Sequence, residues 1–235
     1  MRTAVLAAAA AAALPLTATA IAARPAHKAA AVQDWSRIVA ATPEGGFRMG
    51  NPAARVKLVE YGSLACPHCR HFEETGFDPL VQRYVRTGQV SYEFRNLLIS
   101  GIDIPISLLT RCAGPAKFFA MSKFVYDTQP EWEKKFQDLS SSENAELDKL
   151  TDQQRILRFA EIGDMTQIAA RFGITPAQAR QCLTDPHALQ QLLEMRTKAD
   201  DVGIHRTPTF IINGKVSDAS TWDELEPQLK QAIGG

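Results

Sequence analysis

The chain has 235 residues, of which 45% are hydrophobic, so it can form one sizeable core or one domain that carries a large insertion. Its 26 basic and 26 acidic residues give a formal net charge of zero. Proteins that bind nucleic acid usually carry a basic excess, so this balance argues against a nucleic-acid partner and predicts a mixed-charge, solvated surface.

The first 23 residues have the pattern of a secretory signal peptide. Arg2 supplies a positive charge, an uncharged Ala-rich stretch follows, and small residues suited to cleavage occur at positions 18–22. An uncleaved membrane anchor is the alternative, because the stretch is just long enough to span a bilayer. Ala is only weakly apolar, however, and Pro15 interrupts the stretch. We therefore expect a cleaved signal peptide over residues 1–23 and a tether over residues 24–44.

The next segment predicts strands on either side of a helix. Residues 47–49 lie between glycine-rich turns and predict a short edge strand. Residues 56–61 are rich in β-branched and aromatic side chains and predict a second strand. A helix should begin at Cys66 and should kink just before Pro79. Alternating apolar residues then predict a strand over residues 89–97.

From residue 104 to residue 201 the pattern is almost wholly helical. Apolar residues recur at helical spacing over residues 108–126 and over residues 151–172. Residues 140–144 are polar and predict a loop. Another helix should start at Thr175, which is followed by Pro and by a Gln at the third helical position.

The strand pattern returns near the end of the chain. Residues 207–212 predict a strand, Asn213-Gly214 a two-residue turn, and residues 215–217 its partner strand. A last amphipathic helix should cover residues 222–233. The elements together predict an α/β fold: a central mixed sheet flanked by helices, interrupted by an inserted all-helical domain. We expect the sheet domain over residues 45–103 and 202–235, and the insertion over residues 104–201.

The motif Cys66-Pro67-His68-Cys69 carries the chemistry. Two cysteines on the first turn of a helix can close a small disulfide ring, and the helix N-terminus favours the thiolate that acts as the nucleophile. Cys66 should be the exposed attacking sulfur, and Cys69, one turn further in, the more buried resolving sulfur. The His68 imidazole can stabilise the Cys66 thiolate, which would make the disulfide a stronger oxidant; a solvated His68 without redox effect is the alternative.

Metal binding is the rival interpretation of this motif. His68 or His71 could join the two cysteines around zinc. A structural zinc site usually needs a second closely spaced pair, however, and Cys112 and Cys182 are isolated. We therefore expect neither a metal nor another cofactor, and keep a metal-binding or chaperone module as the alternative.

At this point the sequence resembles a known family. Residues 56–69, with Glu60 six positions before Cys66, and residues 203–210 resemble the two active-site segments of the DsbA family of periplasmic disulfide oxidoreductases. The helical block between them resembles the family's inserted domain. The resemblance implies a thioredoxin-like fold, a periplasmic location, and donation of the Cys66–Cys69 disulfide to reduced exported proteins. It also implies reoxidation by a DsbB-type membrane partner, and we expect a monomer.

The resemblance implies roles for three further residues. Pro208 would be a cis-proline that faces the cysteine pair, and the Thr207 backbone would contact the substrate peptide. Glu60 would be a buried acid that relays the proton of Cys69; a surface position at the end of the strand is its alternative. Oxidases of this family often carry an aliphatic residue where this chain has Thr207, so a disulfide isomerase or reductant is the alternative to an oxidase.

Cys112 and Cys182 both lie in the helical block. In an exported protein they are expected to form a structural disulfide that ties two helices together. Some members of the resembled family have a second disulfide within the helical domain, which supports this pairing. Two buried free thiols are the alternative.

Overall fold

A six-stranded sheet forms the centre of the protein, in the order β1-β2-β4-β3-β5-β6. The computed structural model describes residue 4 and residues 33–235, so the predicted signal peptide and most of the predicted tether lie outside the described residues. The strands are β1 (Val39–Ala41), β2 (Phe47–Met49), β3 (Val56–Gly62), β4 (Val90–Asn96), β5 (Thr209–Ile212) and β6 (Lys215–Val216).

Strands β3 and β4 form the parallel centre of the sheet, and the remaining pairs are antiparallel. Both strands are rich in β-branched and aromatic residues and are largely buried, as expected of parallel strands that are covered by helices. The predicted mixed sheet is confirmed. The hairpin between β5 and β6 turns at Asn213 and Gly214, whose φ angles of 48° and 83° suit a two-residue turn of this type.

One long helical segment connects β3 to β4. It consists of α1 (Pro67–Phe72), a π-helical segment η2 (Glu73–Phe77), α2 (Asp78–Leu80) and a second π-helical segment η3 (Val81–Val85). The segment stays helical through Pro79, where a kink was expected, and its hydrogen bonding widens on both sides of the proline, which has no N–H to donate.

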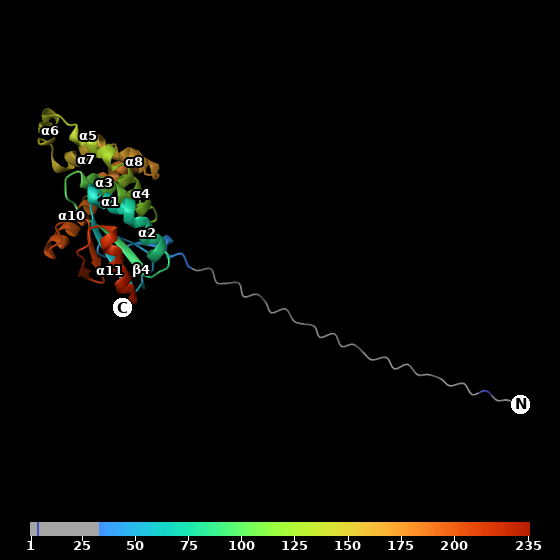
Figure 1. Cartoon of the computed structure of the whole chain (residues 1–235). Coiled ribbons are helices and arrows are strands. Elements are labelled where there is room, and N and C mark those ends of the chain that lie inside the picture. Colours follow the sequence, from blue (N-terminus) through green and yellow to red (C-terminus); the bar gives the residue numbers. More distant parts are fainter. Residues whose placement is uncertain (1–3, 5–32) are drawn as a thin grey trace. The chain divides into compact units, whose positions relative to one another are not determined.

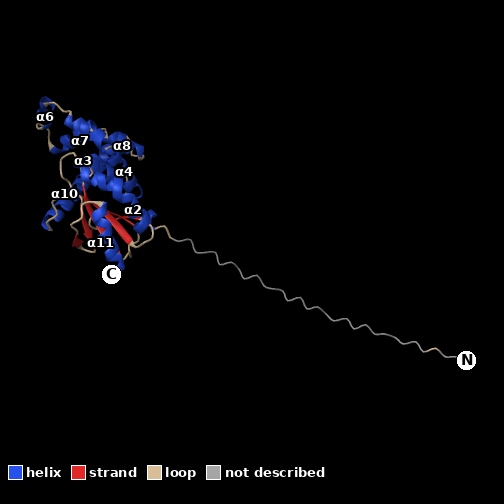
Figure 2. Ribbon diagram, in the orientation of Figure 1, coloured by secondary structure: helices blue, strands red, loops and turns tan. Residues whose placement is uncertain are grey.

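Eight helices follow between β4 and β5. They are α3 (Asp103–Cys112), α4 (Pro115–Asp127), α5 (Gln129–Gln137), α6 (Ser141–Leu147), α7 (Asp152–Ile162), α8 (Met165–Arg171), α9 (Pro176–Leu183) and α10 (Pro186–Asp201). Figures 1 and 2 show α3 to α8 gathered at one end of residues 33–235, with the strands and the last helix, α11 (Trp222–Gly234), at the other. Helix α10 packs against α3 and β4 and so joins the two regions.

The predicted tether is wrong for its last residues. Trp35–Arg37 forms a 3-10 turn, η1, and β1 follows it. The Trp35 N–H donates a hydrogen bond to the Arg86 carbonyl, and β1 pairs along β2. Strand β2 is therefore not the edge strand that was expected, because β1 covers its outer side.

Three predicted segments of the helical block also differ. The pattern over 108–126 is divided at Gly114, which adopts a φ of 74° before Pro115, and the pattern over 151–172 is divided at Asp164, with a φ of 50°. The predicted loop at 140–144 is instead the start of α6, because Ser140 and Glu143 form a capping box. The breaks at Gly114 and Asp164 were not predicted because the apolar periodicity continues across them. The start of α6 was predicted as a loop because its capping residues are polar.

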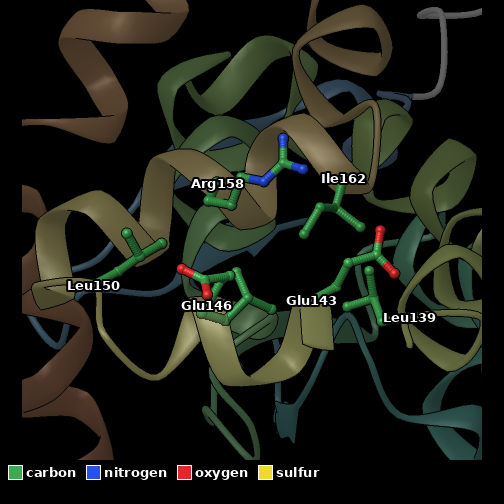
Figure 3. A pocket seen from close by; sticks show the side chains of 7 residues that line it. Leu139, Glu143, Glu146, Leu150, Arg158 and Ile162 are labelled. Carbon is green, nitrogen blue, oxygen red and sulfur yellow. The ribbon is translucent and has the colours of Figure 1, made fainter. Parts of the chain in front are cut away.

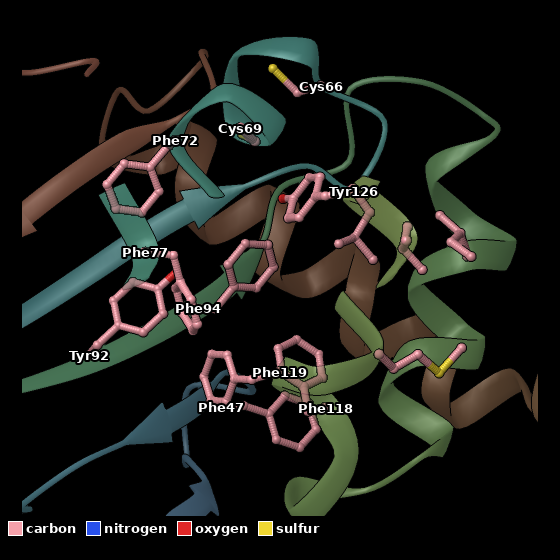
Figure 4. Packing of buried hydrophobic residues seen from close by; sticks show 14 of the residues in the cluster. Phe47, Cys66, Cys69, Phe72, Phe77, Tyr92, Phe94, Phe118, Phe119 and Tyr126 are labelled. Atoms are coloured by element: carbon pink, nitrogen blue, oxygen red, sulfur yellow. The ribbon is translucent and has the colours of Figure 1, made fainter. Parts of the chain in front are cut away.

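An aromatic core joins the sheet to the helical block. The Phe47 ring from β2 stacks on Phe118 from α4 with centroids 4.1 Å apart, and Phe77 from η2 meets the Tyr92 ring from β4 at 5.7 Å (Figure 4). The Phe72 ring from α1 lies 4.7 Å from the Phe210 ring of β5. These contacts fix α1 on the sheet next to the strand that follows Pro208.

Helices α6 and α7 and the residues next to them line a separate open pocket of about 320 Å³ (Figure 3). Its lining is Leu139, Glu143, Glu146, Leu147, Leu150, Arg158 and Ile162. None of these residues belongs to the two segments that carry the cysteine motif and Pro208. In the part of the chain that the structure describes, no helix combines the length and the apolar character needed to cross a membrane.

Cys112 and Cys182 form a disulfide that links α3 to α9, with Cα atoms 6.1 Å apart. The bond closes a long loop, since the two residues are 70 positions apart in the sequence. A cross-link of this span restricts the unfolded chain, and it should stabilise the fold by roughly 2–4 kcal/mol.

We predict that a Cys112→Ala/Cys182→Ala double variant loses roughly 2–4 kcal/mol of unfolding free energy in urea titrations. The variant should still present a reactive Cys66, because the disulfide lies between α3 and α9. An unchanged unfolding free energy, or two alkylatable thiols at these positions in the native unreduced protein, would contradict this account.

Candidate functional site at the start of helix α1

Cys66 is the N-cap residue of α1 and adopts an extended backbone conformation, with φ −96° and ψ 120°. Pro67 follows at the first helical position, where its missing N–H leaves no hydrogen bond unmade. The backbone N–H groups of the first helical turn have no partner within the helix, so they favour a negative charge at the N-cap side chain. Cys66 and Cys69 are both free thiols in the structure.

Cys66 is less accessible than expected, whereas Cys69 is as buried as expected. Cys66 is only 4% exposed, which corrects the prediction of an exposed attacking thiol, and Cys69 is 1% exposed. The physical reason is the loop before β5: the Thr207 carbonyl oxygen lies 3.5 Å from the Cys66 sulfur and accepts a hydrogen bond from the Cys66 thiol when that thiol is protonated. Figure 4 shows Cys66 and Cys69 at the start of the helix, above the aromatic core.

The environment of Cys66 stabilises its thiolate. The Cys69 thiol donates a hydrogen bond to the Cys66 sulfur, and the backbone N–H groups of Cys69 and His68 also point to it. The Cys69 thiol makes the largest contribution, and these groups together with a hydrogen bond from the Thr207 side chain outweigh the effect of burial and lower the pKa of Cys66 to about 5. At neutral pH Cys66 is therefore a thiolate, the form that attacks and leaves in disulfide exchange.

The His68 side chain is exposed. Among residues 33–235, no hydrogen bond joins its ring to the Cys66 sulfur, and its contribution comes from the backbone N–H. The role of the imidazole remains a proposal.

Cys69 has the opposite environment. Burial raises its pKa well above the ordinary value, and the hydrogen bond that it donates to Cys66 holds its proton further. One sulfur of the pair is thus an anion at neutral pH and the other a thiol. This asymmetry supports the predicted roles, with Cys66 as the attacking sulfur and Cys69 as the resolving sulfur.

Glu60 lies on β3 and is only 1% exposed, so the surface position considered for it is wrong. The Tyr92 hydroxyl donates a 2.7 Å hydrogen bond to its carboxyl group. Burial nevertheless dominates and raises the pKa of Glu60 to about 8. The side chain is therefore mostly protonated at neutral pH and can give up a proton to a neighbouring anion.

Glu73 is a second carboxyl group of this region, which the sequence analysis missed. Its backbone N–H donates to the Cys69 carbonyl, so its side chain lies one helical turn beyond Cys69 on the same face. Its Oε1 atom is buried and has no hydrogen-bond partner among the described residues. Burial, with a smaller contribution from the charge of Glu60, raises the pKa of Glu73 to about 8. The four-residue spacing from Cys69 was the signal that could have found it.

The loop before β5 brings Thr207 and Pro208 to the cysteine pair across 141 positions of sequence. The Thr207–Pro208 peptide bond is cis, Pro208 is buried, and Thr207 is half-buried. The structure thus gathers Cys66, Cys69, Thr207 and Pro208 at one place.

The other two cysteines do not join this pair. Cys112 and Cys182 are bonded to each other between α3 and α9. Within residues 33–235, no group of three or more His, Cys, Asp or Glu side chains is arranged to hold a metal ion.

Comparisons with known proteins show the family and the fold of the chain. A family model described as thioredoxin matches residues 42–231. A Rickettsia bellii protein, provisionally named a protein-disulfide oxidoreductase, is 28% identical over 195 residues, which are 81% of this chain and 65% of that protein. The chain thus spans less than two thirds of the length of this relative, and 61% of its Rickettsia typhi counterpart.

Solved structures show the same fold. A protein-disulfide isomerase from Novosphingobium aromaticivorans matches with a TM-score of 0.76 and 26% identity, over 80% of this chain and 97% of that one. Wolbachia pipientis alpha-DsbA1 matches with a TM-score of 0.64 and 19% identity, over 80% and 90% of the two chains. The chain therefore belongs to the thioredoxin family and has the DsbA-like form of its fold, with helices α3–α10 inserted between β4 and β5.

Proposed function

We propose that this protein is a thiol–disulfide oxidoreductase that donates the Cys66–Cys69 disulfide to exported proteins during oxidative folding. A substrate thiolate attacks the Cys66 sulfur, a mixed disulfide forms, and the Cys66–Cys69 bond breaks. A second substrate thiolate then attacks the substrate sulfur of the mixed disulfide and releases Cys66. Two electrons pass from the two substrate thiols to the protein, which is left as the dithiol.

The observation that carries the proposal is the stabilised Cys66 thiolate. A thiolate exists only in the reduced protein, so the hydrogen bonds to Cys66 favour the reduced form and make the disulfide oxidising. Cys66 is also a good leaving group in the second step, since thiols of low pKa leave faster.

Glu60 supports the first step. Cys69 leaves as a buried anion when the disulfide opens, and burial makes that anion unfavourable. A mostly protonated Glu60 can supply the proton that Cys69 needs. Protonation of Cys69 then keeps it from attacking the mixed disulfide in the reverse direction.

The signal-peptide pattern supports export to the periplasm, where a DsbB-type membrane partner would reoxidise the dithiol. A Bacillus subtilis relative, 20% identical over 80% of this chain, is named disulfide bond formation protein D. The neutral charge balance supports a protein substrate and no nucleic acid. We propose that the protein acts as a monomer.

A disulfide isomerase or reductant is the second candidate. Two observations favour it: Thr207 stands before the cis-proline, and the Novosphingobium aromaticivorans protein of the same fold is named a protein-disulfide isomerase. An oxidase and an isomerase or reductant would use the same thiol exchange at Cys66. The direction of electron flow distinguishes the two functions.

We predict that the ultraviolet absorbance of the Cys66 thiolate titrates with a midpoint near pH 5 in the reduced protein. Cys69→Ala should raise the pKa of Cys66 toward the ordinary value of about 8.5, because it removes the largest stabilising hydrogen bond. Cys69→Ser is the matched control, since its hydroxyl still donates, and should leave the midpoint lower than in Cys69→Ala. A wild-type midpoint near 8.5 would refute the stabilised thiolate.

We predict that Glu60→Gln stabilises the reduced protein increasingly as pH rises. The pKa of Glu60 is about 8 when folded and near 4.5 when unfolded, so the folded state keeps its proton in this window and the unfolded state loses it. The contribution of Glu60 to the free energy of unfolding of the wild type is fully present below pH 4.5 and is lost as the pH rises to 8.

Urea unfolding at several pH values checks this prediction. The two proteins should be similar near pH 4.5 and differ by a few kcal/mol at pH 8. Glu74→Gln, a change at an exposed residue of the same helical segment, is the control. A Glu60→Gln difference that does not grow with pH would contradict the protonated buried acid.

A further inference from the structure

Three side chains of the helical insertion bind the backbone that leads into Cys66. The Tyr126 hydroxyl of α4 donates a 3.0 Å hydrogen bond to the Ser63 carbonyl. The Gln129 side-chain amide of α5 donates a 2.9 Å hydrogen bond to the Leu64 carbonyl. Residues 63–65 therefore have two consecutive carbonyl groups held from outside the sheet domain.

The third side chain is Asp103 at the start of α3. Its carboxylate accepts hydrogen bonds from the Ser63 hydroxyl at 2.8 and 2.9 Å and from the Ala65 N–H at 3.1 Å. It also accepts from the Ile99 N–H at 2.9 Å, in the connection between β4 and α3. One carboxylate thus binds both the segment before Cys66 and the entrance to the insertion.

These contacts are buried. Asp103 is 0% exposed, Gln129 1% and Tyr126 3%, and the Ser63 side chain is equally inaccessible. A buried hydrogen bond is costly to break, because the groups left behind have no water to bind. The backbone of residues 63–65 is consequently held in one position.

Both sulfurs depend on that position. The Ser63 carbonyl accepts the Cys66 N–H at 3.2 Å, which sets the turn into the helix. Burial raises the pKa of Cys69. The Ser63 N–H points to the Cys69 sulfur and lowers this pKa, so it partly offsets the effect of burial. A shift of Ser63 would therefore change the stability of both thiolates.

We propose that Tyr126 and Gln129, together with Asp103, are positioning residues through which the helical insertion sets the redox equilibrium of the Cys66–Cys69 pair. This inference rests on the proposed function, since it assigns a role in the same thiol exchange. The three side chains touch neither sulfur: they hold the Ser63–Ala65 backbone so that its N–H groups and the N-cap geometry stay aligned with the sulfurs.

Gln129→Ala and Tyr126→Phe test the proposal, because neither changes the charge near the sulfurs. Gln153→Ala is the matched control: the Gln153 amide also donates to a backbone carbonyl, that of Leu183 at 3.0 Å, but within the insertion. For each protein, the dithiol–disulfide equilibrium is measured against glutathione and the Cys66 thiolate is titrated.

We expect each positioning variant to shift the equilibrium toward the disulfide by roughly fivefold, the factor that corresponds to the loss of about 1 kcal/mol of thiolate stabilisation. The pKa of Cys66 should rise in both variants. Gln153→Ala should leave the equilibrium and the titration unchanged while it lowers the stability of the fold.

Two variants that lose stability yet keep the wild-type equilibrium and the wild-type Cys66 titration would overturn the proposal, because the contacts would then serve folding alone. If Gln129→Ala does not fold, Tyr126→Phe, which removes one hydroxyl, decides the matter. The redox equilibrium and the Cys66 titration of each variant are compared with those of the wild type. A wild-type protein without thiol exchange would instead refute the proposed function.

Discussion

The structure depends on the negative charge that Cys66 carries at the N-cap of α1. Its hydrogen bonds come from the Cys69 thiol, from the Thr207 side chain and from the backbone N–H groups of Cys69 and His68, so most of the donors belong to the same helical turn as the acceptor and one comes from the loop before β5. The backbone donors are fixed by the helix and need no rearrangement when the disulfide opens, and the Cys69 thiol becomes a donor once the disulfide has broken and Cys69 is protonated. The fold therefore favours the reduced pair through the geometry of this helical turn, and the remaining elements serve to place that turn.

The sheet and the helical insertion both hold the first turn of α1 in position. On the sheet side, the Phe72 ring packs on Phe210, and the same strand brings the Thr207 carbonyl to the Cys66 sulfur. On the helical side, Tyr126 and Gln129 bind the backbone just before Cys66. Sheet domain and insertion thus meet at the cysteine motif, which explains how an insertion of eight helices can influence a site that lies on the sheet domain.

Much of this could be predicted from the sequence, where the signal was local. The Cys-x-x-Cys spacing, the Asn213-Gly214 turn and the Thr175 cap each define a short structure by themselves, and all three elements are present. What could not be predicted depends on distant contacts. The sequence does not show that the Thr207 carbonyl covers the Cys66 sulfur, or that Asp103 turns inward to residues 63–65. Helix ends at Gly114 and Asp164 were missed because apolar periodicity continues through them.

The reduction potential of the Cys66–Cys69 pair tests the central claim most directly. If the thiolate of Cys66 is stabilised as the geometry indicates, equilibration with glutathione should give a potential less negative than about −200 mV, on the oxidising side of the range for thioredoxin-fold proteins. A potential near the thioredoxin value of about −270 mV would contradict the account and would identify the protein as a reductant.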